Sequence, residues 1–315
     1  LEELDPLAAA DARVLVEQAR AALLAGQARP SLELLERADA AASDSATRAA
    51  LQFTRARALA ATGAAPELQL AACEAALLAE PGHAAAAETL TALAAGGGEE
   101  RARRVVAVLE GCAAALGGAE QVRLLRRAAA VLHETLHDQA ARLALLRQAV
   151  DNGTGGPEVV LELAAAHLEG DTSEAAEPLL QGVAAAVTGQ RGRLPARCAL
   201  LLGQLAERRG DPTAARARYE EAQRSDASFA PALAALGRLL LAAEQWEAAR
   251  RVLRALLLQL AAGEQQVARA EVLAQLGHVH VALGEKAQGR ALFTRALEER
   301  PGWLEIERAR AALDG

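Results

Sequence analysis

The sequence predicts an all-α chain in which antiparallel helix pairs stack into a right-handed superhelical solenoid without strands. Three observations support this prediction. Hydrophobic residues make up 52% of the 315 positions and aromatic residues only 2%, and the abundant alanine, leucine, arginine, glutamate and glutamine are strong helix formers. A leucine–glycine pair recurs along the second half of the chain. Glycine and proline turn signals separate the helical stretches.

The recurring pair defines a register for the helix pairs. Its copies are spaced by 34 and then 40 residues, at Leu202-Gly203, Leu236-Gly237 and Leu276-Gly277. Twelve residues after each glycine stands a small residue, and four residues further a large one: Ala215 with Tyr219, Ala249 with Leu253, and Gly289 with Phe293. We expect the small residue to let the two helices of a pair approach closely. The large residue then fills the space toward the next pair.

Two turns carry the signals that end one helix and begin the next. Gly210-Asp211-Pro212 supplies a helix stop, an N-cap oxygen and a first-turn proline in that order. Gly170-Asp171 with Glu174 repeats this arrangement as a capping box, because the glutamate lies three residues beyond the cap. Both turns predict a short connection between two antiparallel helices.

The first half of the chain carries weaker copies of the same pattern. We predict hairpins over 26–38 and 63–81 and a bend at Leu136–Asp138, with breaks at 96–100 and 151–157. The whole chain then holds roughly seventeen helices.

Residues 1–152 are predicted to form a degenerate half of one continuous solenoid, and residues 153–315 a more regular half. The amphipathic stretch Trp303–Leu313 closes the chain as a capping helix, because the last repeat would otherwise expose its apolar side. Its polar outer face is expected to carry Glu305, Glu307, Arg308 and Arg310.

These features resemble the tetratricopeptide repeat, whose pattern is W-x₂-L-G-x₂-Y…A-x₃-F…P. The matching positions are Leu273, Leu276, Gly277, His280, Gly289, Phe293 and Pro301. His280 replaces the usual tyrosine and Gly289 the usual alanine. The resemblance is clearest over 195–313. It implies a noncatalytic scaffold or adaptor that binds a peptide or a partner protein in a concave groove, as a possible part of a larger assembly.

The resemblance also implies which residues face a ligand, since the first helix of each pair lines the groove in this family. These groove residues are Arg197, Gln204, Arg238, Glu271 and His278. The mixed charges suit a peptide or a partner helix better than a small apolar molecule. The family's carboxylate-clamp subtype uses asparagines and lysines on this surface. It is not expected here, because Asn152 and Lys286 are the only such residues and both stand in turns.

One stretch has the H-E-x-x-H form of zinc metalloproteases. In His133-Glu134-Thr135-Leu136-His137 the two histidines would lie one turn apart on a helix, Glu134 could activate a zinc-bound water, and Glu158 is a candidate third ligand. Against this reading, no strand-forming stretch upstream can build a substrate-binding sheet. The stretch also coincides with the predicted bend. A zinc peptidase or metal-binding protein centred on His133 and His137 is therefore an alternative, and we predict no metal, cofactor or enzymatic activity.

The cysteines and the basic clusters point to no further chemistry. Cys73, Cys112 and Cys198 each lie in an apolar helical stretch, which predicts free buried thiols and a reducing compartment. The net charge of −7 argues against a nucleic-acid partner. Two arginine clusters are interpreted as solvated helix faces rather than an anion patch: Arg101, Arg103 and Arg104, then Arg123, Arg126 and Arg127.

Composition also bears on the origin and compartment of the chain. The only lysine is Lys286 and the only isoleucine is Ile306, which indicates a G+C-rich bacterial source. The longest uncharged run, 178–190, is too short to cross a bilayer, so we expect no membrane insertion. Methionine is absent, and we expect the natural chain to extend upstream of Leu1. The compartment is predicted to be the cytoplasm, or the periplasm if a signal peptide precedes Leu1. A third hypothesis makes the chain the interaction region of a larger enzyme.

Overall fold

The computed structural model describes residues 6–261 and 269–313. Within these ranges the chain forms seventeen α-helices, one π-helical turn and one 3₁₀ turn, and no strand. The all-α prediction is thus confirmed, together with the expected number of helices. The chain divides into two compact units, 1–159 and 160–315, whose boundary falls within one helix. The predicted contrast between a degenerate and a regular half stays a prediction.

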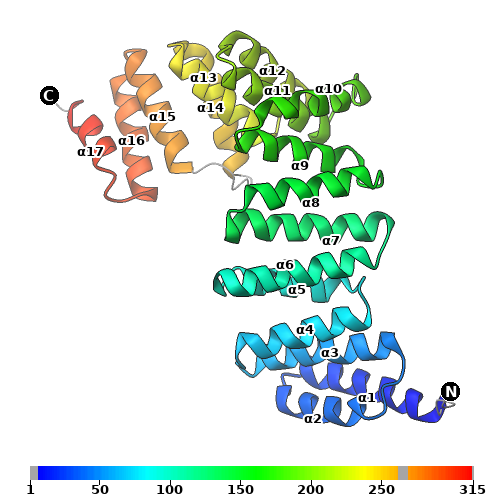
Figure 1. Cartoon of the computed structure of the whole chain (residues 1–315). Helices are drawn as coiled ribbons and strands as arrows, with labels where there is room; N and C mark the ends of the chain where they lie inside the picture. Colours follow the sequence, from blue (N-terminus) through cyan, green and yellow to red (C-terminus); the bar gives the residue numbers. More distant parts are fainter. Residues whose placement is uncertain (1–5, 262–268, 314–315) are drawn as a thin grey trace. The chain divides into compact units, whose positions relative to one another are not determined.

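In the first unit, neighbouring helices pair through short glycine-containing turns, as in α1 with α2 and α3 with α4 (Figure 1). Its α-helices are α1 (Pro6–Leu24), α2 (Ala28–Asp39), α3 (Ser45–Ala61), α4 (Pro66–Ala79), α5 (Ala84–Ala94), α6 (Gly98–Ala114), α7 (Gly118–Val131), α8 (Gln139–Asp151) and the start of α9 (Gly156–Glu169). The predicted hairpin over 26–38 is present: Ser31 is buried and its hydroxyl donates to the Ala19 carbonyl oxygen at 2.8 Å.

The second unit contains the hairpins formed by α11 with α12, α13 with α14, and α15 with α16. Its helices after α9 are α10 (Ala176–Ala186), α11 (Arg193–Arg208), α12 (Pro212–Ser225), α13 (Ala230–Ala242), α14 (Trp246–Ala261), α15 (Arg269–Ala282), α16 (Lys286–Glu299) and α17 (Leu304–Ala311). One apolar core made of alanine, leucine and valine, with Tyr219 and Phe229, runs from α11 to α15.

The glycines of the repeat register are the points of closest helix contact. A methyl group added to Gly277 would lie 2.5 Å from Phe293 Cε1, and one added to Gly237 would lie 2.9 Å from Leu253 Cδ2. The same addition at Gly203 would overlap the ring of Tyr219. The large residue therefore packs onto the glycine of its own hairpin. The sequence led us to expect that it fills the space toward the next pair.

The turn between α11 and α12 forms as predicted. Gly210 has a φ of 74°, a left-handed conformation that favours glycine. Asp211 is the N-cap and accepts a hydrogen bond from the Ala214 backbone N–H at 2.8 Å, while Pro212 occupies the first turn. Asp211 thus satisfies one otherwise unpaired backbone donor of α12, and Pro212 removes another.

The capping box predicted at Asp171 and Glu174 is wrong. A 3₁₀ turn, Ser173–Ala175, precedes α10, and its N-cap residue Thr172 makes no side-chain cap. The Thr172 hydroxyl instead contacts Nδ1 of the buried His167 at 2.7 Å. A buried ring nitrogen needs a partner, and Thr172, the N-cap residue of the 3₁₀ turn, supplies it.

The last helix packs one side against the α15–α16 hairpin, and its role as a cap of the solenoid stays a prediction. In α17, Ile306 is buried against Leu273, Phe293 and Ala296, while Glu305 is exposed. Arg300 lies over the Trp303 ring, 4.6 Å from its centroid, at the start of this helix. Across the described residues, no helix combines the length and the apolar character that a bilayer span requires.

Candidate functional site

Two of the five predicted groove residues lie together in a surface hollow of the second unit. Gln204 of α11 and Arg238 of α13 line it with Leu168 of α9 and Leu201 of α11, in a volume of about 660 Å³. The remaining lining residues are Ala165, Glu169, Glu207 and Arg208. We name it the α9–α11–α13 hollow. It joins an apolar floor to polar side chains.

Arg238 is oriented in this hollow by an acidic neighbour. Its Nη2 donates to Glu207 Oε2 at 2.6 Å, and the same oxygen accepts a hydrogen bond from the Tyr219 hydroxyl of α12. The bond to Glu207 raises the pKa of Arg238. Burial, and then the bond to Glu207, raise the pKa of Tyr219. Arg238 thus stays cationic and Tyr219 stays a neutral donor around neutral pH.

Gln204 differs from its neighbours in the hollow. Among the described residues, its exposed side-chain amide has no hydrogen-bond partner. Arg208, in contrast, donates to the Gly170 carbonyl oxygen at 3.0 Å. An amide carries both donors and an acceptor, the same groups that a peptide backbone presents. The hollow therefore offers one uncommitted peptide-like group beside a fixed guanidinium.

The other three predicted groove residues are not among those lining the hollow. Arg197 is half-buried on α11. Glu271 is exposed at the start of α15, where one of its oxygens lies 3.6 Å from Arg300 Nη1. His278 is exposed and packs its ring edge-on to Phe293, with centroids 4.9 Å apart. A ligand-facing role for these three stays a prediction.

A second hollow, of about 530 Å³, lies between α10, α11 and α12. Its mouth carries an ion pair in which Arg209 Nη1 donates to Glu177 Oε1 at 3.1 Å and Nη2 contacts the other oxygen. The Arg209 guanidinium holds the pKa of Glu177 below its usual range. The amide that lines this hollow, Gln181, also donates to Glu177 Oε1 at 3.1 Å, so this hollow offers less to a ligand than the α9–α11–α13 hollow with its unpaired Gln204 amide.

The H-E-x-x-H stretch lies at the predicted bend. Leu132–Leu136 forms a π-helical turn, and His137 follows with a left-handed φ of 52°. Asp138 then caps α8 by accepting from the Ala141 backbone N–H. The continuous α-helix that the i, i+4 zinc geometry needs therefore ends before His137.

The two histidines of this stretch have other polar contacts. His133 Nδ1 lies 3.0 Å from Arg142 Nη1, and His137 Nδ1 lies 3.0 Å from the His133 carbonyl oxygen. Glu158, the candidate third ligand, is exposed at the start of α9. Within the described ranges, no group of three or more His, Cys, Asp or Glu side chains is placed to hold a metal ion.

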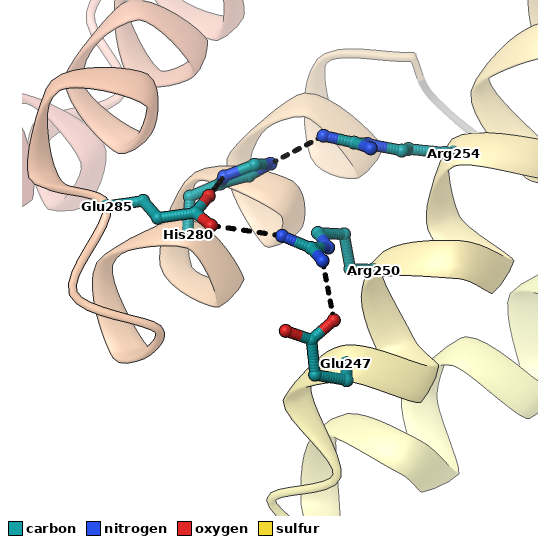
Figure 2. Close-up of polar contacts among 5 residues, drawn as sticks. All are labelled: Glu247, Arg250, Arg254, His280 and Glu285. Atoms are coloured by element: carbon teal, nitrogen blue, oxygen red, sulfur yellow. Dashed lines mark hydrogen bonds and ion pairs between the residues drawn. The ribbon is translucent and has the colours of Figure 1, made fainter.

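A polar cluster centred on His280 joins α14 to the α15–α16 hairpin (Figure 2). The buried His280 ring contacts the Glu285 carboxylate through Nδ1 and lies 3.4 Å from Arg254 Nη2 through Nε2. A guanidinium only donates, so Nε2 accepts and the proton resides on Nδ1, which donates to Glu285. Arg250 bridges the second Glu285 oxygen at 3.1 Å to Glu247 at 2.6 Å. His280 thus occupies the usual tyrosine position of the repeat as a link between hairpins.

The three cysteines are free and buried, as predicted. Burial, and to a smaller extent neighbouring glutamates, raise the pKa of Cys73 and of Cys198 to about 11. Burial also raises the pKa of Cys112.

The first arginine cluster is engaged in ion pairs, with Arg103 bound to Glu99 of its own helix and the other two arginines bound to a neighbouring helix. Arg101 contacts Glu67, Arg104 contacts Glu74, and both of these acidic partners belong to α4. Arg104 keeps its guanidinium protonated, since the bond to Glu74 raises its pKa.

The sequence reasoning missed Glu207 as part of the hollow and Tyr219 as the residue that donates to it. Their contact joins the end of α11 to the middle of α12, so it depends on how the two helices pack. A signal was nevertheless present: Tyr219 is the only tyrosine of the chain and stands where the next two repeats carry Leu253 and Phe293.

Comparison with known proteins identifies the fold. No family model matches the chain, and no curated protein matches it. Among solved structures, a tetratricopeptide repeat protein from Parabacteroides merdae is similar over 85% of this chain and 99% of its own, with a TM-score of 0.50 and 12% identity. The structure of the APC/C hetero-tetramer Cut9-Hcn1 is similar over 95% of this chain, with a TM-score of 0.53 and 13% identity. This chain spans 55% of the matched chain of that assembly. The chain thus has the tetratricopeptide-repeat fold that its sequence pattern predicts.

Proposed function

We propose that this protein is a noncatalytic scaffold that binds an extended peptide segment of a partner protein in the α9–α11–α13 hollow. The observation that carries the proposal is the free Gln204 amide beside the Arg238 guanidinium, above the apolar side chains of Leu168 and Leu201. A peptide backbone can pair with the amide and accept a hydrogen bond from the arginine through a carbonyl oxygen, while its side chains cover the leucines.

The charge of the hollow favours a peptide over a free anion. Its lining holds two acidic residues, Glu169 and Glu207, and two basic ones, Arg208 and Arg238, so the formal charges cancel. A neutral hollow gains little from a bare phosphate or carboxylate. It suits uncharged hydrogen-bonding groups instead.

The structural neighbours support a role in assemblies. The Cut9-Hcn1 structure is a hetero-tetramer of two proteins, and this chain has the same kind of fold. We propose that the chain acts likewise within a larger assembly, in the cytoplasm, or in the periplasm if a signal peptide precedes Leu1. It would serve either alone or as the interaction region of a longer protein.

The test starts from a random-sequence peptide library displayed on phage and selected on the whole protein. The affinity of a selected synthetic peptide is then measured by isothermal titration calorimetry. We expect Gln204→Ala to weaken binding about threefold to tenfold, as for the loss of one neutral hydrogen bond, and Arg238→Ala about tenfold to a hundredfold, since its bonds are charge-assisted.

The matched controls are Gln288→Ala and Arg295→Ala, which remove the same side-chain types from exposed positions of α16. We expect them to leave the affinity unchanged. The proposal fails if no peptide is selected, or if the hollow variants bind as well as the wild type.

A further inference from the structure

One side chain under the hollow carries a polar group that its packing does not require. Tyr219 is fully buried and its ring covers Gly203. At the equivalent positions of the next two hairpins, Leu253 covers Gly237 and Phe293 covers Gly277 with no hydroxyl. An apolar ring or chain therefore suffices for the contact with the glycine, and the Tyr219 hydroxyl needs another explanation.

The hydroxyl donates to a carboxylate that in turn holds an arginine. Glu207 Oε2 receives both the Tyr219 hydroxyl and Arg238 Nη2, the latter at 2.6 Å. Exposure rises along this series: the Tyr219 side chain is buried, that of Glu207 is 20% exposed, and that of Arg238 is 60% exposed. The three residues thus connect the core of the α11–α12 hairpin to a group open to a ligand.

The hairpin with the Tyr219 hydroxyl also has the Glu207 carboxylate, and the next two hairpins lack both groups at the equivalent positions. Glu207 lies four residues after Gly203, and the corresponding positions after Gly237 and Gly277 hold Leu241 and Val281. The repeats without a tyrosine hydroxyl thus also lack the acceptor that it would serve. This joint occurrence coincides with the repeat that builds the hollow.

We infer that Tyr219 is a positioning residue of the α9–α11–α13 hollow. Its hydroxyl holds the Glu207 carboxylate in place, and Glu207 in turn fixes the Arg238 guanidinium in the orientation that donates to a peptide carbonyl oxygen. This inference rests on the proposed function. Because Nη2 is the atom committed to Glu207, the other guanidinium donors remain available to a ligand. A fixed donor loses less conformational entropy on binding than a mobile one.

The competing explanation is a structural link between hairpins, since Glu207 belongs to α11 and Arg238 to α13. A purely structural link predicts that Tyr219→Phe lowers stability and leaves the mobility and ligand affinity of Arg238 unchanged. The two explanations therefore differ in a measurement made on Arg238 itself.

The first experiment observes Arg238 without any ligand, by nitrogen-15 NMR of arginine side chains in the whole protein. We expect separate Nη1 and Nη2 signals for Arg238 in the wild type, because the bond to Glu207 slows rotation of the guanidinium. Tyr219→Phe and Glu207→Gln should each merge these signals, while Arg295 remains unchanged in all three proteins. Unchanged Arg238 signals in Tyr219→Phe would overturn the inference.

A spectroscopic control tests the hydroxyl contact directly. Because Tyr219 is the only tyrosine, its ionisation can be followed by ultraviolet absorbance without interference from other phenols. We expect Glu207→Gln to shift this ionisation to lower pH, since a negative acceptor opposes formation of the phenolate. No shift would show that the contact is absent in solution, and the inference would fail.

The second experiment measures binding of the phage-selected peptide. We expect Tyr219→Phe to weaken binding about threefold to tenfold in the wild-type background and to have no further effect in the Glu207→Gln background, as a double-mutant cycle requires for residues acting through one another. Gly277→Ala, which overpacks a hairpin outside the hollow, is the control for lost stability and should bind as the wild type does.

The NMR and binding results together distinguish a failure of the proposed function from a failure of the positioning role of Tyr219. If Arg238 responds in NMR but no peptide binding depends on Gln204 or Arg238, the proposed function fails and the positioning role falls with it. If peptide binding depends on Gln204 and Arg238 but not on Tyr219, the proposed function stands and only the positioning role is overturned.

Discussion

At the scale of single residues, one missing methyl group sets how closely two helices approach. Gly277 faces the Phe293 ring so tightly that an added methyl would lie 2.5 Å from Cε1. Gly182, in the middle of α10, has no atom within 4 Å of the corresponding methyl position. The same substitution should therefore have opposite effects at the two glycines.

We expect Gly277→Ala to lower the free energy of unfolding by about 1–3 kcal/mol, because the aromatic ring and the backbone must shift to admit the methyl group. Gly182→Ala should raise it by about 0.5–1 kcal/mol, since alanine favours a helix over glycine. Urea denaturation followed by circular dichroism measures both. Equal effects of the two substitutions would contradict the packing described for the repeat register.

A second prediction at this scale concerns the H-E-x-x-H stretch. Because His137 follows a π-helical turn with a left-handed backbone, we expect zinc to bind the native protein no more tightly than it binds a His133→Ala variant. Isothermal titration with zinc chloride measures this affinity, and Glu134→Gln should change no peptide hydrolysis. Stoichiometric zinc that is lost on mutating either histidine, with hydrolysis abolished by Glu134→Gln, would make the metal hypothesis the leading one.

Residue-level sequence reasoning succeeded where a side chain bonds to a backbone group of its own turn and failed where the partner depends on how the chain packs. Asp211 caps α12 three residues away, which the local pattern predicts. The bond from Tyr219 to Glu207 requires the packed hairpin, and the pairing of Thr172 with His167 depends on which groups become buried. Of the groove residues, Gln204 and Arg238 line one hollow, and their ligand-facing role stays a prediction.

At the scale of an element, the ends of helices show which local signals hold. The N-terminus of α3 is capped by Asp44, whose Oδ1 accepts from the Thr47 backbone N–H at 2.8 Å and whose Oδ2 accepts from the Thr47 hydroxyl at 2.7 Å. These bonds lower the pKa of Asp44 to about 2, and the bond from the Thr47 backbone N–H has the largest effect. The folded state therefore favours the ionised carboxylate.

This cap makes the stability of the first unit dependent on pH. Because the pKa of Asp44 is lower in the folded state than its ordinary value of 3.8, its contribution is complete above that value and is lost as the pH falls toward about 2. We expect Asp44→Ala to cost about 0.5–2 kcal/mol at pH 7 and progressively less below pH 4. Asp44→Asn keeps a cap acceptor and should show a smaller loss of stability on acidification.

Thermal denaturation of the three proteins between pH 2 and pH 7 measures this effect. A constant difference in stability between wild type and Asp44→Ala over that range would contradict the assigned role of the carboxylate.

The bend before α8 shows a helix end whose position the sequence predicted but whose form it did not. Its position at Leu136–Asp138 followed from the pattern, but its π-helical form depends on one extra residue being accommodated in the turn.

At the scale of the whole molecule, charged residues lie on the surface of a chain whose buried residues are almost entirely apolar. Many arginines pair with acidic residues of the same or a neighbouring helix, and in the described part of the chain at least one side chain of each pair stays partly exposed to water. Arg103 and Glu99, for example, keep 68% and 70% of their side-chain surface exposed. Exposed pairs contribute little individually, so burial of alanine and leucine provides most of the stability.

We therefore expect the free energy of unfolding, measured by urea denaturation, to fall by no more than about 1 kcal/mol when sodium chloride is raised from 0.1 M to 1 M. The added salt screens only the weak attractions between exposed charged side chains. Equilibrium denaturation at the two salt concentrations measures it. A loss of several kcal/mol would mean that the ion pairs between helices, rather than the apolar core, hold the hairpins together.

The buried thiols have a practical consequence for work in solution. With pKa values near 11 for Cys73 and Cys198, only on the order of one molecule in ten thousand carries either thiolate at pH 7, and the surrounding side chains exclude reagents. A cysteine introduced at an exposed position such as Gln288 would therefore react with a maleimide far faster than the native thiols. A fluorophore can then be attached at one chosen place without first removing any natural cysteine.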